Sequence, residues 1–128
     1  MINGNIKQFL DTGWYNADAE IYYNGFIYWF EAQKENNSNL YHFWIDKWRV
    51  EKNDDFTFNT YCYSKNRELV EYQRVFSMKH NDLDFIKETY LKSPIFEGKS
   101  FWEVEKKLAW LDDSGRSVII NSIDDMAK

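Results

Sequence analysis

The chain has 128 residues, a net charge of −5 and one cysteine, and 20% of its residues are aromatic. This length fits a single domain, residues 1–128, that can bury a core without disulfides or metal ions. So many rings exclude a disordered chain. The acidic charge argues against direct nucleic-acid binding, which needs many Lys and Arg side chains to neutralise phosphates.

The sequence carries no sign of export or of membrane insertion. Its longest apolar run, Phe26–Phe30, is too short for a signal peptide or a spanning helix. The lone Cys62 has no second cysteine to pair with, which is typical of a reducing compartment. The many Lys and Asn codons indicate an AT-rich genome. We therefore expect a cytoplasmic protein with no membrane contact, in a low-GC bacterial cell or delivered there by a phage or mobile element.

The N-terminal half predicts a helix followed by a β-hairpin and two further strands. Gly13 ends the helix. Asn24-Gly25 favours the two-residue type I′ turn of a hairpin. In chain order, the predicted elements are a helix at 3–12 and strands at about 14–23, 26–33, 40–50 and 56–64.

Residues 67–78 fit two patterns. Val70, Tyr72, Phe76 and Met78 alternate as in a strand, with Arg74 as the one break, whereas the spacing of Tyr72 and Phe76 also fits a helix. We predict a strand because it completes a meander.

The C-terminal third predicts two helices and a short last strand. Asp82 caps a helix that runs to about Lys92. Ser100 and Glu103 have the spacing of a capping box, which opens a helix to about Leu111, and a short strand is predicted at 117–123. The whole pattern predicts an α+β fold: an antiparallel β-meander of about five strands, with a short N-terminal helix and two C-terminal helices packed on the sheet.

The Asn24-Gly25 turn fixes which side chains share a face of the hairpin. It places Glu20 opposite Trp29 and Asp18 opposite Glu31. Because side chains alternate along a strand, one face is uniformly apolar and the other is mixed. Side chains alternate in the third strand as well, so this strand extends both the apolar face and the mixed face. The residues expected on the mixed face are Trp14, Asp18, Glu20, Tyr22, Trp29, Glu31, His42, Trp44, Asp46 and Trp48.

The mixed face admits several interpretations. Asp18 opposite Glu31 is a like-charge pair that costs up to about 1 kcal/mol. Solvent can relax this pair, a partner's Lys or Arg can neutralise it, or the two acids can form a catalytic or metal-binding cluster with His42. The spacing secures too few convergent ligands for a metal, so we expect neither a metal ion nor a cofactor.

The tryptophans of this face have three explanations. One of the two C-terminal helices covers them, or they bind a protein, or they stack nucleic-acid bases. Cover by a helix is the simplest of the three. Base stacking is the weakest, because only Lys47 and Arg49 lie close enough to form a basic rim.

The function expected from these features is that of a small acidic, non-enzymatic protein, because no catalytic motif is found. It would act by protein–protein contact, as an inhibitor, an immunity protein or a phage anti-defence factor, and be a monomer or homodimer. Acids among rings suit a partner with a basic surface. The alternative is a small-molecule-binding domain or minor enzyme with an aromatic pocket, using Glu31 and His42 as general acid and base. The candidate partner-binding residues are Asp18, Glu20, Trp29, Glu31, His42, Trp44, Asp46 and Trp48.

Overall fold

A computed structural model describes residues 1–2, 4–15, 19–54, 57–63, 66–111 and 118–122, the last segment by its backbone alone. In these residues seven strands form one sheet: β1 (Ala19–Tyr23), β2 (Phe26–Lys34), β3 (Tyr41–Lys52), β4 (Phe58–Thr60), β5 (Gln73–His80), β6 (Ala109–Trp110) and β7 (Val118–Ser122). The helical segments are α1 (Ile6–Gln8), the π-helical turn η1 (Phe9–Gly13), α2 (Leu83–Lys92), α3 (Phe101–Val104) and the 3₁₀ turn η2 (Glu105–Lys107). The predicted α+β class is confirmed.

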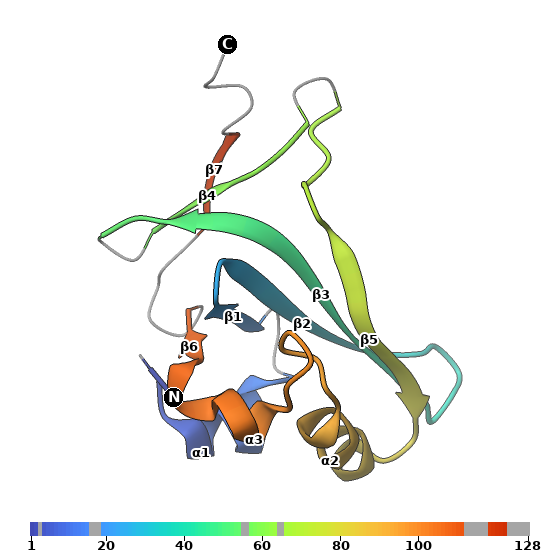
Figure 1. Cartoon of the computed structure of the whole chain (residues 1–128). Helices are drawn as coiled ribbons and strands as arrows, with labels where there is room; N and C mark the ends of the chain where they lie inside the picture. The colour runs from blue at the N-terminus through green and yellow to red at the C-terminus, as the bar shows by residue number, and fades with distance from the viewer. Residues whose placement is uncertain (3, 16–18, 55–56, 64–65, 112–117, 123–128) are drawn as a thin grey trace.

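The long strand β3 pairs with β2, β4 and β5 and so connects the two parts of the sheet (Figure 1). The strand order is β6-β1-β2-β3-β4-β7, and β5 pairs with β3 beside β4. β3 can hold both strands along one edge because its residues 41–47 pair with β5 and its residues 50–52 pair with β4. β7 matches the predicted last strand, but it runs parallel to β4, whereas the other paired strands are antiparallel.

The hairpin forms with the predicted register. Asn24 and Gly25 have φ values of 49° and 89°, and a type I′ turn needs positive φ at both central positions. Glu20 lies opposite Trp29, as predicted. The predicted pair of Asp18 with Glu31 falls outside the described residues.

The strand predicted in residues 67–78 is confirmed from Gln73 onward. It starts no earlier because Glu71 has a φ of 55°, in the left-handed region that interrupts extended backbone. Before it, Leu69 makes an isolated bridge with Cys62. The helical alternative for this segment is therefore excluded.

The helix predicted at 100–111 is shorter than expected. Its capping box forms as predicted, with the Ser100 hydroxyl and the Glu103 carboxylate each accepting the other residue's backbone N–H. The α-helix nevertheless ends at Val104, and Ala109 and Trp110 become β6, which pairs with β1. This pairing satisfies backbone groups of β1 and buries the Trp110 ring, and these gains outweigh the helical spacing of the local sequence.

Trp14 does not lie on the mixed face, contrary to the prediction. The chain stays helical through η1 up to Gly13, and β1 begins only at Ala19, so strand alternation does not apply to Trp14. Its ring is 1% exposed, with its centroid 5.1 Å from that of Phe43 and 5.2 Å from that of Tyr90.

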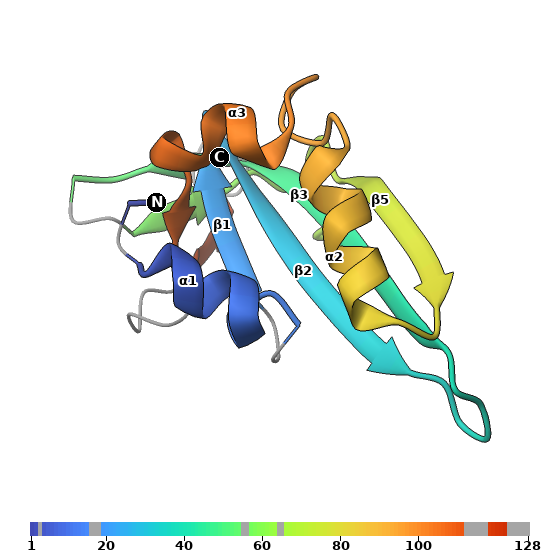
Figure 2. The same ribbon diagram turned by 90° about the horizontal axis from the view of Figure 1, so that it is seen from below.

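The helices pack on the predicted apolar face of the sheet (Figure 2). The main core joins Tyr28, Phe30 and Phe43 of the sheet to Tyr90 of α2 and Phe101 of α3. Burying this uniformly apolar face removes more apolar area from water than covering the mixed face would. The interpretation that a C-terminal helix covers the tryptophans of the mixed face is therefore wrong.

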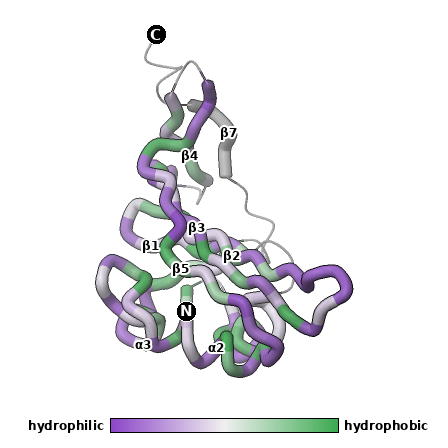
Figure 3. Tube along the Cα trace, turned by 90° about the vertical axis from the view of Figure 1, so that its right-hand side faces the viewer, coloured by the Kyte–Doolittle hydropathy of each residue, from purple (hydrophilic) through white to green (hydrophobic). Residues whose placement is uncertain are grey.

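Strands, rather than helices, cover one end of the mixed face. A second apolar cluster forms there, next to the hairpin turn, and Figure 3 shows β4 at the end of the molecule away from α2 and α3. Its buried members are Ile27, Trp48, Val50, Phe58, Ala109 and Leu111. This cluster leaves the remainder of the mixed face for other contacts.

Candidate functional site

We call the part of the mixed face beyond this cluster the open face. It carries side chains of β2 and β3, and of β5 with the residue that precedes it. The open face consists of Trp29, Glu31, His42, Trp44, Asp46, Tyr72, Arg74 and Ser77. Helices α2 and α3 lie on the opposite side of the sheet, so they do not cover it.

The β2–β3 register brings together most of the residues predicted for this face. Trp29 lies opposite Asp46, and Glu31 lies opposite Trp44. His42 lies two residues before Trp44 on β3, opposite Gln33. Because one strand periodicity controls all these positions, the shared face could be predicted from alternation alone.

Asp46 is the most buried ionisable group of the open face. It is 1% exposed, and its Oδ1 accepts a hydrogen bond from Arg74 Nε at 2.9 Å. Its Oδ2 accepts from an Arg74 terminal nitrogen at 3.3 Å and from the Tyr72 hydroxyl. The carboxylate is thus neutralised within the protein, and we assign it the role of holding Arg74 and Tyr72 in place.

Arg74 and Tyr72 were not predicted to belong to this site. The one signal was that Arg74 breaks the alternation of its segment. The structure explains the break, because Phe76 lies opposite Ile45 whereas Arg74 lies opposite Asp46, which leaves Val75 as an extra residue. Such a β-bulge re-aims a neighbouring side chain, and here it places Arg74, the residue before the bulge, opposite Asp46.

The rings of the open face form a connected row. The Arg74 guanidinium lies 5.1 Å from the Trp44 ring centroid, and the Trp44 and His42 rings are 4.6 Å apart. On the other side of Asp46, Tyr72 stacks on Trp48 at 6.2 Å, and Trp48 meets Trp29 edge-on at 6.3 Å. Trp48 itself is buried, so it supports Trp29 and Tyr72 from below.

The ionisation states of the row follow from these contacts. Burial, together with the hydrogen bond to Asp46, raises the pKa of Tyr72 to about 12. The hydrogen bond to Asp46 also raises the pKa of Arg74. At neutral pH the tyrosine is therefore a neutral donor and the arginine is charged.

Of the predicted acids, Glu20 and Glu31 remain half-buried on the mixed face, and Asp18 falls outside the described residues.

His42 contacts a hydroxyl rather than a carboxylate. Its Nε2 lies 3.0 Å from Ser77 Oγ. Burial, followed by the charges of Lys79 and Arg74, lowers the pKa of His42. Nowhere in the described part of the chain do three His, Cys, Asp or Glu side chains gather closely enough to hold a metal ion.

The lowered pKa of His42 makes folding favour its neutral form. An unfolded histidine titrates at about pH 6.5, so below that pH the unfolded chain takes up the proton first and folding stability is lost. We expect the wild type to lose more free energy of unfolding than His42→Gln when the pH falls from about 7.5 to about 5.5. Urea unfolding at each pH measures this difference, and equal losses in the two proteins would contradict it.

Within the residues that the structure describes, no helix combines the length and the apolar character needed to cross a membrane. No protein-family model matches the chain, and no curated protein or solved structure is detectably similar to it.

Proposed function

We propose that the protein is a non-enzymatic binding protein that acts by contact between its open face and another protein. The observation that carries this proposal is the row of partly exposed rings held by a buried ion pair. Trp29 and Trp44 are half-buried and Tyr72 is 47% exposed. Trp, Tyr and Arg are the residues most enriched among those that dominate binding energy at protein interfaces.

The rigidity of the open face supports the same function. Arg74 and Tyr72 are fixed by Asp46, and Trp44 packs against the Arg74 guanidinium. Side chains that are already ordered lose little conformational entropy when a partner binds. The open face therefore has the anchors and the pre-organisation of a binding surface.

Charge favours a partner with a basic surface. The chain carries a net charge of −5, and Glu20 and Glu31 lie among the rings of the mixed face. Acidic groups on such a surface raise the association rate with a basic partner and exclude acidic ones. An inhibitor, immunity protein or phage anti-defence factor in a bacterial cytoplasm, acting as a monomer or homodimer, fits these properties. Trp29, Glu31, His42 and Trp44 would contact the partner, with Asp46 and Trp48 supporting them from below.

A binding measurement on Trp44 tests the proposal. The partner is first captured from host lysate by cross-linking and purified, and its affinity is then measured by calorimetry. We expect Trp44→Ala to weaken binding by about 30-fold, the effect of losing a central anchor worth about 2 kcal/mol.

The matched control is Trp102→Ala, because Trp102 is 53% exposed but belongs to α3 on the other side of the sheet. Its affinity should equal that of the wild type. Glu31→Lys should weaken binding more at low salt than at high salt. Unchanged affinity in both Trp44→Ala and Glu31→Lys would rule out the open face as the binding surface.

A further inference from the structure

Side-chain alternation along β3 predicts a core residue at the position of Lys47. Phe43 and Ile45 of β3 point to the helix-covered side and are fully buried, and Lys47 continues the same row. Its neighbours across the sheet are Tyr28 of β2 and Gln73 of β5. A lysine in this row calls for an explanation, because charged side chains are rarely placed on an apolar face without a partner.

The described residues place rings against this ammonium group but give it no hydrogen-bond acceptor. Lys47 Nζ lies 4.3 Å from the Phe26 ring centroid and 5.9 Å from that of Tyr28. The two nearby carboxylates have other partners, since Glu71 pairs with Arg49 at 2.8 Å and a Glu97 oxygen accepts from the Asn24 amide at 3.2 Å. Among the residues described by the structure, no hydrogen bond or ion pair to Lys47 Nζ is formed.

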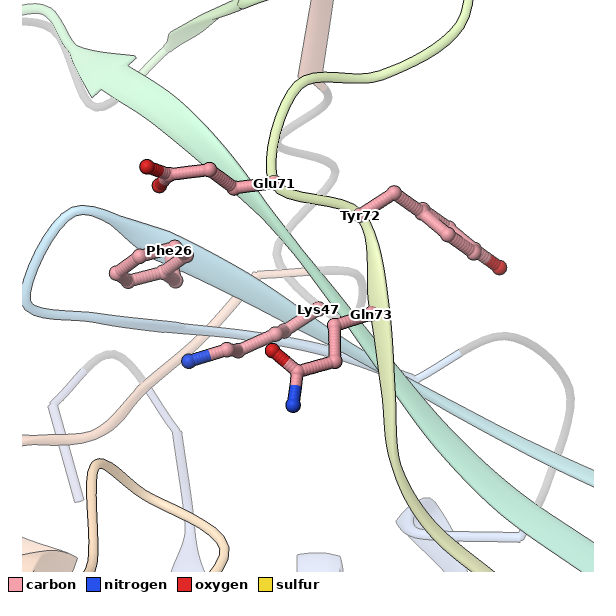
Figure 4. A pocket seen from close by; sticks show the side chains of 5 residues that line it. All are labelled: Phe26, Lys47, Glu71, Tyr72 and Gln73. Carbon is pink, nitrogen blue, oxygen red and sulfur yellow. The ribbon is translucent and has the colours of Figure 1, made fainter.

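Lys47 and Gln73 line a pocket of small-molecule size (Figure 4). The pocket has a volume of about 430 Å³, and its other lining residues are Phe26, Glu71 and Tyr72. Figure 4 shows Lys47 and Gln73 extending to the same side of their strands, near the Phe26 ring, whereas Tyr72 points away from them.

An adjoining hollow extends this pocket toward the loop after α2. It has a volume of about 270 Å³ and shares Lys47 and Gln73 with the first pocket. Its other lining residues are Arg74, Val75, Pro94, Ile95, Glu97 and Gly98, of which Pro94 and Ile95 form an apolar wall. A ligand bound here would therefore meet the Lys47 ammonium, the Gln73 amide and the apolar surfaces of Phe26, Pro94 and Ile95. The carboxylates of Glu71 and Glu97 also border the two hollows, and each already has a partner in Arg49 or Asn24.

We propose that this pocket binds a small organic carboxylate with a planar apolar body. The carboxylate accepts charge-assisted hydrogen bonds from Lys47 Nζ and a hydrogen bond from the Gln73 amide. The body lies against Phe26 and the Pro94–Ile95 wall. The donors Lys47 and Gln73 lie across the sheet from the open face, and Tyr72, which borders the pocket, points away from them. The site does not depend on the proposed partner binding.

Nuclear magnetic resonance titration of the ¹⁵N-labelled full chain with benzoate tests the proposal. We expect saturable shifts centred on the amides of Phe26, Lys47 and Gln73. Benzamide, which has the same shape without the charge, should bind at least about tenfold more weakly, since a charge-assisted hydrogen bond is lost. Inorganic phosphate should also bind more weakly than benzoate, because it cannot use the apolar wall.

Two variants test whether benzoate binding depends on the proposed donors Lys47 and Gln73. Lys47→Met retains a stem of similar length over Phe26 and should weaken benzoate binding at least about tenfold. Gln73→Glu places a competing carboxylate at an exposed position and should weaken it too. Lys34→Met, at the exposed end of β2, is the matched control and should bind benzoate like the wild type.

Three results would overturn the proposal: no saturable shift with benzoate, the same benzoate affinity in Lys47→Met, or phosphate binding as tightly as benzoate. The two proposals fail separately, because Lys47→Met should leave partner affinity unchanged. Likewise, Trp44→Ala should leave benzoate binding unchanged.

Discussion

Replacing Trp14 by alanine is expected to lower the free energy of unfolding by about 4 kcal/mol. The indole is 1% exposed and is enclosed by Tyr15, Phe43 and Tyr90, whose ring centroids lie 5.0 to 5.2 Å from its own. Its removal loses the transfer free energy of a large ring and leaves a cavity that the surrounding rings can fill only in part.

Denaturant unfolding of matched tryptophan variants measures this effect. Trp44→Ala removes the same side chain from the half-buried open face, where solvent fills the space, and should cost about 1 kcal/mol or less. Equal losses of stability in the two variants would show that Trp14 is not a core residue. Strand alternation extended back from β1 would place both rings on the mixed face, so the comparison separates the two arrangements.

Replacing Arg74 by methionine is expected to lower the free energy of unfolding by about 3 kcal/mol. The guanidinium is the cation that neutralises Asp46, and Asp46 is 1% exposed. Without Arg74, the Tyr72 hydroxyl is the one side-chain donor to the buried carboxylate that remains among the described residues. The Arg74 side chain is itself 48% exposed, so water entering its place limits the loss.

The double variant Asp46→Asn with Arg74→Met is the control for this mechanism. A neutral amide at position 46 needs no counter-charge, so the double variant should be more stable than Arg74→Met alone by about 1 kcal/mol. Chemical unfolding of the wild type, the two single variants and the double variant completes the cycle. Purely additive losses would mean that Arg74 acts by packing on Trp44 and not through the buried charge.

Adjacent residues of β3 contribute to two different surfaces. Asp46 orders the open face, and Lys47 points to the pocket on the helix-covered side. Alternation along one strand therefore supplies a candidate protein-binding surface and a candidate ligand pocket from consecutive positions.

Local sequence was sufficient for the elements whose geometry depends on a few neighbouring residues. Asn24-Gly25 formed its turn because asparagine and glycine accept positive φ. The turn and the period of two then set the β1–β2 register and the faces of β2 and β3. Asp82 and Ser100 began their helices because their side chains accept backbone N–H groups that the first helical turn leaves unpaired.

The remaining features depended on contacts between residues far apart in the chain. Trp14 entered the core because η1 kept the backbone helical up to Gly13, and α3 stopped at Val104 because β1 had an edge for Ala109 and Trp110 to pair with. The burial of Asp46 required a bulge in β5 that brought Arg74 onto it from 28 residues along the chain. In each case non-local pairing and burial contributed more free energy than the local sequence preference did. The periodicity of the sequence contains no information about that balance.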